Sequence, residues 1–263
     1  MPVFNSPSVA LITGASNGLG ASTARLFARA GAAVVITARR QAELDKIAEV
    51  IADEGGTVLA VAADLGDDAS VAALVKAVMD RFGQIDFVVN IGGTAEGIGT
   101  KLWQITAAQW RQIEAANIAG PMNLIRHVVP KMLARGQGRM LFLSSSATTR
   151  PVARTGAYTA TKAAVNAMVE TLALEVEAAP IAFLAFNPGP IDTATYKGVV
   201  TALEQPAAMR NIAQPPDKAA LLPLWLCSPA TWGVTGVFVQ WRDPDVVHPL
   251  EQFAQALPAM LGR

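Results

Sequence analysis

Short apolar runs and longer segments with helical spacing alternate along this chain. The runs have the length of β-strands, and the segments between them carry apolar residues every three to four positions. Strands are expected at 8–13, 33–37, 58–61, 85–89, 139–144, 181–186 and 237–241, and helices at 18–30, 41–53, 68–81, 106–135, 158–178 and 217–227. This alternation predicts an α/β fold, a doubly wound parallel sheet of the Rossmann type.

Two further segments depart from the alternation. Residues 190–216 show no clear period, so we expect irregular structure there, with 194–216 as a candidate lid over a substrate or, alternatively, a surface loop with one short helix. Residues 246–263 have apolar residues at helical spacing and predict an added amphipathic helix, which would cover the substrate pocket or a neighbouring subunit. Because the chain contains neither a linker nor a repeat, we expect one domain over 1–263.

Charge and composition exclude several classes of function. Lys plus Arg and Asp plus Glu both number 21, and there is no basic run, so neither nucleic acid nor a membrane surface is an expected partner. No apolar run reaches the roughly 18 residues of a membrane-spanning helix. The N-terminal residues lack a signal-peptide pattern, and Cys227 is the only cysteine, so we expect a cytoplasmic protein without an intrachain disulfide. No Cys/His cluster has metal-ligand spacing, and no metal is expected.

A glycine-rich turn joins the first predicted strand to the first predicted helix. It reads TGASNGLG over 13–20, which is the context that a phosphate-binding turn requires. Gly14 permits a tight turn, Gly18 lets the backbone approach a pyrophosphate, and Gly20 allows the helix to pack closely on the strand. The start of the helix adds free N–H groups and the positive end of a dipole.

The same turn also matches a different catalytic motif. Residues 14–18 read G-x-S-x-G, the nucleophile elbow of serine hydrolases, with Ser16 as the nucleophile. A triad would need an Asp and then a His later in the chain, and His248 is available. We keep this hydrolase as an alternative, although it explains neither Gly20 nor the basic pair that follows the second strand.

That basic pair bears on the choice of cofactor. Ala38, Arg39 and Arg40 end the second strand about 20 residues after the glycine turn, where an acidic residue would bind the ribose 2′-hydroxyl of NAD. Arginine binds phosphate oxygens bidentately, so this pair favours the 2′-phosphate of NADP(H) over NAD(H). The alternative is that both arginines are simply solvated.

Candidate ligand-binding residues follow the later strands, at the edge where ligands bind in such sheets. Asp64 follows the third strand, near the expected adenine; the alternative is a helix N-cap, for which Asp67 or Asp68 is better placed. Small residues at 90–93 would let a cofactor lie across the strand ends. Pro188 and Gly189 fix a turn after the sixth strand, and Thr193 is a candidate to bond a carboxamide.

Tyr158 and Lys162 are the candidate catalytic pair. At a spacing of four residues they share one face of a helix, where the ammonium would favour phenolate and lower a tyrosine pKa of about 10. Such a pair can transfer protons. Ser145 follows an apolar run and can donate a hydrogen bond to a developing oxyanion. The alternative for Tyr158 and Lys162 is a chance spacing.

Asn117 and Pro121 mark a break in the long helix predicted over 106–135. Proline cannot donate to the carbonyl four residues earlier, so Pro121 should kink the helix and free the carbonyl of Asn117. A free carbonyl beside an amide side chain makes a good water site. The alternative is that Pro121 only bends the helix around the core.

Taken together, these motifs resemble the short-chain dehydrogenase/reductase family over about residues 8–240. The family pattern TGxxxGxG matches 13–20 and YxxxK matches 158–162, and the order of the other motifs agrees. The resemblance implies that Tyr158 is the general acid/base, that Lys162 lowers its pKa and binds the nicotinamide ribose, that Ser145 holds the substrate oxygen, and that Asn117 holds a water. It implies cofactor binding by Gly14, Ser16, Asn17, Gly18, Leu19, Gly20, Arg39, Arg40, Asp64, Leu65, Asn90, Gly92, Tyr158, Lys162, Pro188, Gly189, Ile191 and Thr193.

The resemblance has local exceptions. The family usually has Asn-Asn-Ala-Gly where this chain has Asn-Ile-Gly-Gly at 90–93, and Asp-Gly-Gly where it has Trp-Arg-Asp-Pro-Asp at 241–245. Members are often tetramers joined through helices equivalent to 106–135 and 158–178, so a homo-oligomer, tetramer or dimer, is the expected assembly.

The implied function is hydride transfer between NADP(H) and a carbonyl or secondary alcohol of a small or medium, largely apolar substrate. A 3-oxoacyl-thioester reductase is an alternative within this class. A nucleotide-binding sensor or scaffold that keeps the fold without turnover is an alternative of another class, against which the intact Ser145, Tyr158 and Lys162 argue.

Overall fold

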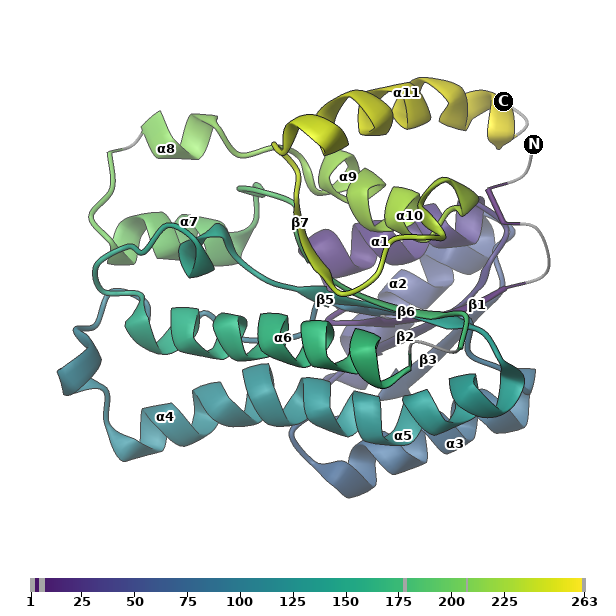
Figure 1. The fold of residues 1–263 in the computed structure, drawn as a ribbon, viewed down its shortest axis with the longest axis horizontal. Coiled ribbons are helices and arrows are strands. Elements are labelled where there is room, and N and C mark those ends of the chain that lie inside the picture. The colour runs from purple at the N-terminus through teal and green to yellow at the C-terminus, as the bar shows by residue number, and fades with distance from the viewer. Residues whose placement is uncertain (1–2, 5–7, 177–178, 207, 262–263) are drawn as a thin grey trace.

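A single seven-stranded parallel sheet organises the molecule, in a computed structural model that describes residues 3–4, 8–176, 179–206 and 208–261 (Figure 1). The strands are β1 (Val9–Thr13), β2 (Ala33–Ala38), β3 (Val58–Ala62), β4 (Phe87–Asn90), β5 (Gly138–Leu143), β6 (Ile181–Asn187) and β7 (Val237–Gln240). Their order across the sheet is β3-β2-β1-β4-β5-β6-β7. The predicted doubly wound fold is confirmed, with every predicted strand found within two residues at each end.

Helices cover both faces of this sheet. They are α1 (Gly18–Arg29), α2 (Gln41–Asp53), α3 (Asp68–Phe82), α4 (Ala107–Glu114), α5 (Gly120–Arg135), α6 (Gly156–Glu175), α7 (Ala194–Ala202), α8 (Ala208–Asn211), α9 (Pro216–Ala219), α10 (Leu221–Leu226) and α11 (Pro244–Met260). Short 3₁₀ turns occur at Leu102–Gln104, Ser146–Thr148 and Pro229–Thr231.

The strands are apolar throughout because both of their faces are buried. In β1, Ile12 packs in one core cluster with Phe27 of α1, whereas Leu11 packs in the other with Leu74 of α3. Successive side chains of a strand point to opposite faces, so one short apolar run contributes to both clusters. The first cluster also contains buried residues of α2, α10 and α11, and the second those of α5 and α6.

The sheet reverses its winding between β1 and β4, which are neighbours although two strands separate them in sequence. Thr13 at the end of β1 is in register with Asn90 at the end of β4. Ligands of open α/β sheets bind outside the carboxyl ends of the strands at such a switch point. The topology therefore directs attention to this edge.

The expectation of irregular structure at 190–216 is wrong. Helix α7 occupies 194–202, with the Thr193 hydroxyl capping it by accepting from the amide of Tyr196 at 3.2 Å, and α8 occupies 208–211. These helices are too short to show a clear apolar period, which explains why the sequence pattern missed them. Residue 207, within the candidate lid, lies outside the described residues. The single helix expected at 217–227 is two helices, α9 and α10.

The long helix predicted at 106–135 is interrupted, as the position of Pro121 indicates. A π-helical turn at Ala115–Ala119 separates α4 from α5, and the amide of Gly120 donates to the carbonyl of Ala115, five residues earlier. Pro121 then starts α5 where a missing N–H is tolerated. The break places Asn117 on the widened turn.

The amphipathic helix predicted for the tail is present as α11, with residues 262–263 outside the described part. Phe253 and Leu257 are buried, and α11 lies over α9 and α10 in Figure 1. Among the described residues, no helix is long and apolar enough to cross a membrane. Met122 and Leu133 of α5 and Leu174 of α6 are exposed. The expected homo-oligomer stays a prediction.

Candidate active site

The glycine turn between β1 and α1 has a backbone that other residues would not tolerate. Gly14 and Gly18 have φ of +65° and +52°, in the left-handed region that favours glycine. A Cβ on Gly14 would lie 2.8 Å from the backbone of Gly92, and one on Gly20 would overlap the carbonyl of Gly14. The turn therefore lies tightly against the residues that follow β4, and α1 packs closely on the turn, where the sequence predicted that Gly20 allows close packing.

Thr13 fastens this turn to β4, a role that sequence reasoning missed. Its buried hydroxyl donates to Asn90 Oδ1 at 2.6 Å and accepts from the amides of Ile91 at 3.1 Å and Gly92 at 3.0 Å. The available signal was a polar residue ending an apolar strand directly before Gly14. This arrangement also gives Asn90 its local support, although the following residues depart from the family pattern.

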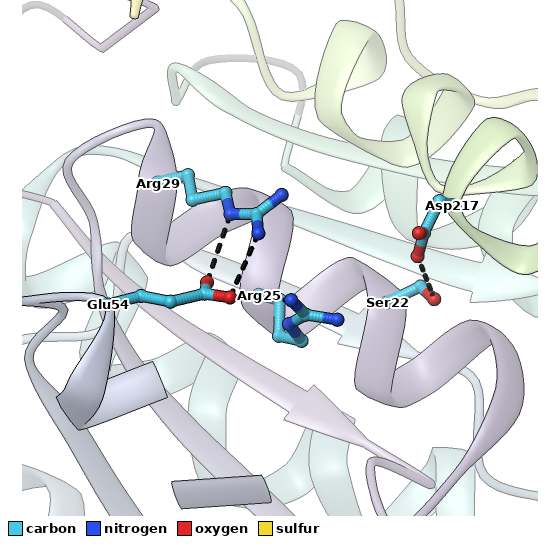
Figure 2. A network of polar contacts seen from close by, with 5 residues as sticks. All are labelled: Ser22, Arg25, Arg29, Glu54 and Asp217. Atoms are coloured by element: carbon cyan, nitrogen blue, oxygen red, sulfur yellow. Dashed lines mark hydrogen bonds and ion pairs between the residues drawn. The ribbon is translucent and has the colours of Figure 1, made fainter. Parts of the chain in front are cut away.

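Polar contacts on its outer side join helix α1 to neighbouring segments (Figure 2). Glu54, directly after α2, accepts from Arg25 at 2.5 Å and from Arg29 at 2.9 and 3.0 Å. Hydrogen bonds from Arg29 and then Arg25 hold the pKa of this carboxyl below its ordinary value. Ser22 donates to Asp217 of α9 at 2.5 Å. The helix behind the glycine turn is thus fixed to two neighbouring helices.

The start of α1 fits a bound pyrophosphate. Its N-cap, Asn17, is exposed and makes no side-chain capping bond, and the first turn contains no acidic residue. The first N–H groups of a helix have no intrahelical partner, so they are available to an anion there. A Cβ on Gly18 would lie 3.0 Å from Cγ2 of Thr193, which brings the segment after β6 against the turn. Leu19 and Gly20 are buried beneath.

The two arginines after β2 are both exposed but differ in their partners. Arg40 donates to Glu43 at 2.5 and 2.6 Å, and Glu43 is also hydrogen bonded to Ser16. The bond from Arg40 lowers the pKa of Glu43. Within the described residues, Arg39 has no hydrogen bond or ion pair. Of the pair, Arg39 is therefore the side chain that is free to bind a ligand phosphate.

Asp64 and Leu65 follow β3 beside this edge. Asp64 is exposed, and its carboxylate accepts from the amide of Gly66 at 3.0 Å. The N-cap of α3 is Asp67, so the alternative reading of Asp64 as that cap is wrong. A Cβ on Gly92 would lie 3.3 Å from Cδ1 of Leu65. Leu65 therefore lines the same region as the end of β4.

Ser145, Tyr158 and Lys162 come together at the carboxyl end of β5. The side chain of Ser145 interacts with the Tyr158 hydroxyl, and its Oγ accepts from the amide of Ala147 at 3.2 Å. Lys162 Nζ donates to the carbonyl of Leu143 at 2.8 Å and lies 5.7 Å from the centroid of the Tyr158 ring. The spacing of four residues does place both side chains on one face of α6.

The effect of this cluster on the tyrosine differs from the expectation. Burial raises the pKa of Tyr158 to about 12, and the interaction with Ser145 only partly opposes it. Burial also lowers the pKa of Lys162 to about 8. The pKa of Tyr158 thus lies above its ordinary value and not below it, because loss of water around the phenol is the largest influence and the Lys162 ammonium is not among its causes.

Asn117 links this cluster to the end of β4. Its Oδ1 accepts from the amide of Thr94 at 2.8 Å, and its Nδ2 donates to the Thr94 carbonyl at 3.0 Å and to Thr161 Oγ1 at 3.2 Å. A Cβ on Gly93 would lie 2.8 Å from Asn117 Oδ1 and 3.7 Å from Lys162 Nζ. Asn117 thus fixes the loop after β4 at a position beside Lys162.

The residues after β6 complete the edge. Gly189 has φ of +83°, and a Cβ there would overlap the indole of Trp241, which begins the segment that departs from the family pattern. Gln214 Nε2 donates to the Pro188 carbonyl at 2.5 Å, and Ile191 forms a bridge with Gln214. This contact closes the base of the segment that contains α7.

The hydrolase alternative does not assemble. His248 is exposed on α11, where its ring nitrogen is hydrogen bonded to Gln252 at 2.9 Å. Ser16 is hydrogen bonded to Glu43. A serine nucleophile needs a histidine base within hydrogen-bond reach, and here the two side chains have other partners.

Comparison with known proteins agrees with this geometry. The family model for short chain dehydrogenases matches residues 8–204. The cis-4-hydroxycyclohexanecarboxylate dehydrogenase of Sinomonas cyclohexanicum is 32% identical over 235 residues, 88% of this chain and 93% of that protein.

Two solved structures are similar as well. A 7α-hydroxysteroid dehydrogenase complexed with NADH and 7-oxo glycochenodeoxycholic acid has a TM-score of 0.83 and 26% identity, over 91% of this chain and 94% of that one. A metagenomic short-chain oxidoreductase in complex with NADP has a TM-score of 0.75 and 29% identity, over 89% and 96% of the two chains. The predicted fold and resemblance are both confirmed.

Proposed function

This chain belongs to the short-chain dehydrogenase/reductase family of oxidoreductases, and we propose that it reduces a ketone to a secondary alcohol with NADPH, or runs the reverse reaction. The observation that carries the proposal is the cluster of Ser145, Tyr158 and Lys162 at the carboxyl end of β5, on the sheet edge that also holds the glycine turn. These are the side chains that a proton transfer at a carbonyl oxygen requires.

The roles follow from the geometry. A substrate oxygen beside the Ser145 and Tyr158 hydroxyls would accept a hydrogen bond from each, and the Tyr158 proton would pass to the oxygen as it becomes an alcohol. When bound, the nicotinamide group supplies or accepts the hydride at the carbon. Burial raises the pKa of Tyr158 to about 12, so Tyr158 carries the proton that it would donate to the oxygen. Lys162 would bind the cofactor ribose. Asn117 would hold a water through which protons pass.

The cofactor proposal is NADP(H). The pyrophosphate would lie on the glycine turn and the start of α1, and the 2′-phosphate against Arg39. Arg39 is the better candidate of the pair because Arg40 is held by Glu43, whose carboxylate would also repel a phosphate. The segment from Pro188 to Thr193 would contact the nicotinamide end.

The substrate class that we propose is a cyclic, largely apolar ketone or secondary alcohol. The names of two similar proteins support it, since one is a dehydrogenase of a hydroxycyclohexane carboxylate and the other a hydroxysteroid dehydrogenase. The roles of Ser145 and Tyr158 do not depend on this choice.

The direct test is oxidation of NADPH against a panel of cyclic ketones, aldehydes and 3-oxoacyl thioesters, with Tyr158→Phe as the variant. We expect turnover of at least one cyclic ketone, and a fall of about 10²- to 10⁴-fold in kcat for Tyr158→Phe because the proton donor is lost. NADPH binding should persist in the variant. NADPH binding by the wild type without turnover of any substrate would instead support the nucleotide sensor.

The cofactor preference is tested with Arg39→Ala and Arg40→Ala. Loss of a hydrogen bond to a charged group is worth about 1.5–3 kcal/mol, so Arg39→Ala should raise the Kd for NADPH by about 10- to 100-fold and leave that for NADH nearly unchanged. Arg40→Ala serves as the matched comparison and should have the smaller effect. Equal losses for NADPH and NADH in Arg39→Ala contradict the assignment.

A further inference from the structure

Three chain segments border the place where the proposed substrate would lie beside Tyr158. They are residues 94–100 after β4, residues 149–155 after β5, and residues 194–206 after β6, and they are called the pocket segments below. Their strands are adjacent in the sheet, so the segments emerge side by side at its carboxyl edge. The relative positions of the three would set the width of a substrate pocket.

One side chain, Arg154, contacts the other two pocket segments. Its Nε donates to the carbonyl of Gly99 at 2.7 Å, and its Nη2 donates to the carbonyl of Ala202 at 2.9 Å. Its backbone carbonyl accepts from the amide of Gly99 at 2.8 Å, and its Nη1 lies 3.3 Å from Glu204. A planar guanidinium can reach both carbonyls at once, which a lysine ammonium cannot do in the same geometry.

The backbone at this junction is in an uncommon conformation. Arg154 and Glu204 have φ of 65° and 54° and are the two non-glycine residues with positive φ in the described ranges. Each such residue costs on the order of 1 kcal/mol or more and persists only where its surroundings hold it. Gly99 has φ of +94°, and a Cβ there would lie 2.8 Å from the Ala202 carbonyl. All three segments therefore turn through left-handed residues where Arg154 joins them.

The junction is connected to the catalytic side chains. Residue 94 is bonded to Asn117 through its backbone, so the first pocket segment is fixed at one end by Asn117 and at the other by Arg154. A Cβ on Gly97 would lie 3.8 Å from the Ala157 side chain, next to Tyr158. Helix α7 in turn begins at Thr193, against the glycine turn.

We propose that Arg154 is a positioning residue for substrate binding, which holds the three pocket segments at the spacing that fits the substrate. This inference rests on the proposed function, because it assumes that the substrate binds beside Tyr158. Arg154 itself has each of its side-chain nitrogens occupied by these segments, so it acts through them. The chemistry of proton transfer remains with Tyr158.

The kinetic test compares Arg154→Lys and Arg154→Ala with the wild type on the best cyclic ketone. Because pocket width affects binding before chemistry, we expect KM to rise about tenfold in both variants while kcat stays within about threefold. The Kd for NADPH should not change. Unchanged KM in both variants, or equal losses of kcat and NADPH affinity that indicate general misfolding, overturns the proposal.

Glu204→Gln is the matched control. The Glu204 side chain is 79% exposed and its ion pair with Arg154 is long, so its removal should change KM by less than about twofold. A tenfold rise of KM in this variant would mean that the ion pair with Glu204 determines substrate binding. It would overturn the assignment of this role to the hydrogen bonds from Arg154 to the two carbonyls.

Hydrogen exchange supplies a readout that does not depend on turnover. In Arg154→Lys, amides in 97–100 and 199–206 should exchange faster than in the wild type, whereas those of α3 should not change. A wild-type protein that reduces no ketone overturns the proposed function itself, and the exchange comparison then decides alone whether Arg154 joins the segments. Active wild type with unchanged exchange and unchanged KM in the variant overturns only this inference.

Discussion

A buried cationic side chain lies at each end of strand β5, and the two differ in their hydrogen-bond partners. Arg139 lies at the amino end and Lys162 contacts the carboxyl end, and each side chain belongs to a residue that is 4% exposed. In the described part of the chain neither has a carboxylate partner. Arg139 donates to the carbonyls of Leu226, Thr231 and Val234 and to the Thr231 hydroxyl, whereas Lys162 donates to the Leu143 carbonyl alone.

The difference supports a structural role for Arg139 and is consistent with the functional role proposed for Lys162. A buried charge is tolerated when hydrogen bonds replace its water, and Arg139 uses both terminal nitrogens of its guanidinium in this way to hold the end of α10 and the segment after it. Lys162 is left with unused donors on the edge where a ligand would bind. Its burial therefore destabilises the fold, and such groups cluster at functional sites.

The surroundings at the amino end support this interpretation. Cys227 lies near Arg139, and burial raises the pKa of its thiol to about 12, so it stays neutral. Asp86 is also buried there, but it accepts from the Val9 amide at 2.7 Å and from Arg135 at 2.5 Å. A cavity of about 350 Å³ borders these groups on the edge opposite Tyr158. The proposed active site lies instead at the other edge, beside Tyr158 and the switch point between β1 and β4.

The largest expected effect in this comparison is on stability, in Arg139→Met. Four acceptors would lose their donor, and a buried acceptor left unsatisfied costs about 1–3 kcal/mol, so we expect a loss of several kcal/mol in the free energy of unfolding. Urea unfolding measures the loss, and Arg139→Lys should be intermediate because it keeps the charge with fewer donors. The kcat of the folded variant should match the wild type. A loss below about 1 kcal/mol would contradict the structural role.

Lys162→Met should raise the free energy of unfolding, whereas Arg139→Met should lower it. Burial holds the pKa of Lys162 near 8, about 2.5 below its ordinary value, which corresponds to at most about 3 kcal/mol of destabilisation at neutral pH. Part of the gain is offset because the Leu143 carbonyl loses its donor, so we expect an increase of about 1–3 kcal/mol in the free energy of unfolding. Activity should fall sharply in the same variant.

The effect of Lys162 should be recognisable in the pH dependence of the free energy of unfolding. Between about pH 8 and pH 10 the unfolded chain holds the Lys162 proton more tightly than the folded protein, so Lys162 makes the stability rise with pH. Cys227, whose pKa burial raises to about 12, opposes this rise in the upper part of the range, so Lys162→Met is the reference profile. Lys162→Met should lack this rise. Tyr158→Phe should keep it and should rise more steeply near pH 10, because there an unfolded tyrosine begins to lose its proton while the buried Tyr158 keeps its own. Equal pH profiles for the wild type and Lys162→Met would show that Lys162 is not desolvated.

The smallest effect is expected for an exposed cation, in Arg39→Ala. Arg39 has no partner in the described residues, so its removal should change the free energy of unfolding by less than about 0.5 kcal/mol. The loss of NADPH affinity proposed above should therefore appear without a stability change. A larger loss of stability would mean that Arg39 has a structural role, and would weaken the use of this variant as a cofactor probe.

The sequence by itself determined the elements of the fold and the composition of the site. Apolar runs of strand length, with helical periods between them, are local signals, and so are the glycine turn at 13–20 and the spacing of Tyr158 and Lys162. Each signal depends on residues a few positions apart. Over that range the backbone geometry of a helix or strand determines where the side chains point. Short helices such as α7 carry too few periods for this signal.

Only the tertiary structure decided how the site residues are held and charged. Thr13 meets Asn90 across 77 residues, and Arg154 meets Gly99 and Ala202 across 55 and 48, distances in sequence over which no local pattern extends. The pKa of Tyr158 followed from burial, not from the neighbouring Lys162. The desolvation of a group depends on everything that packs around it. The direction in which its pKa shifts is therefore known only from the folded structure.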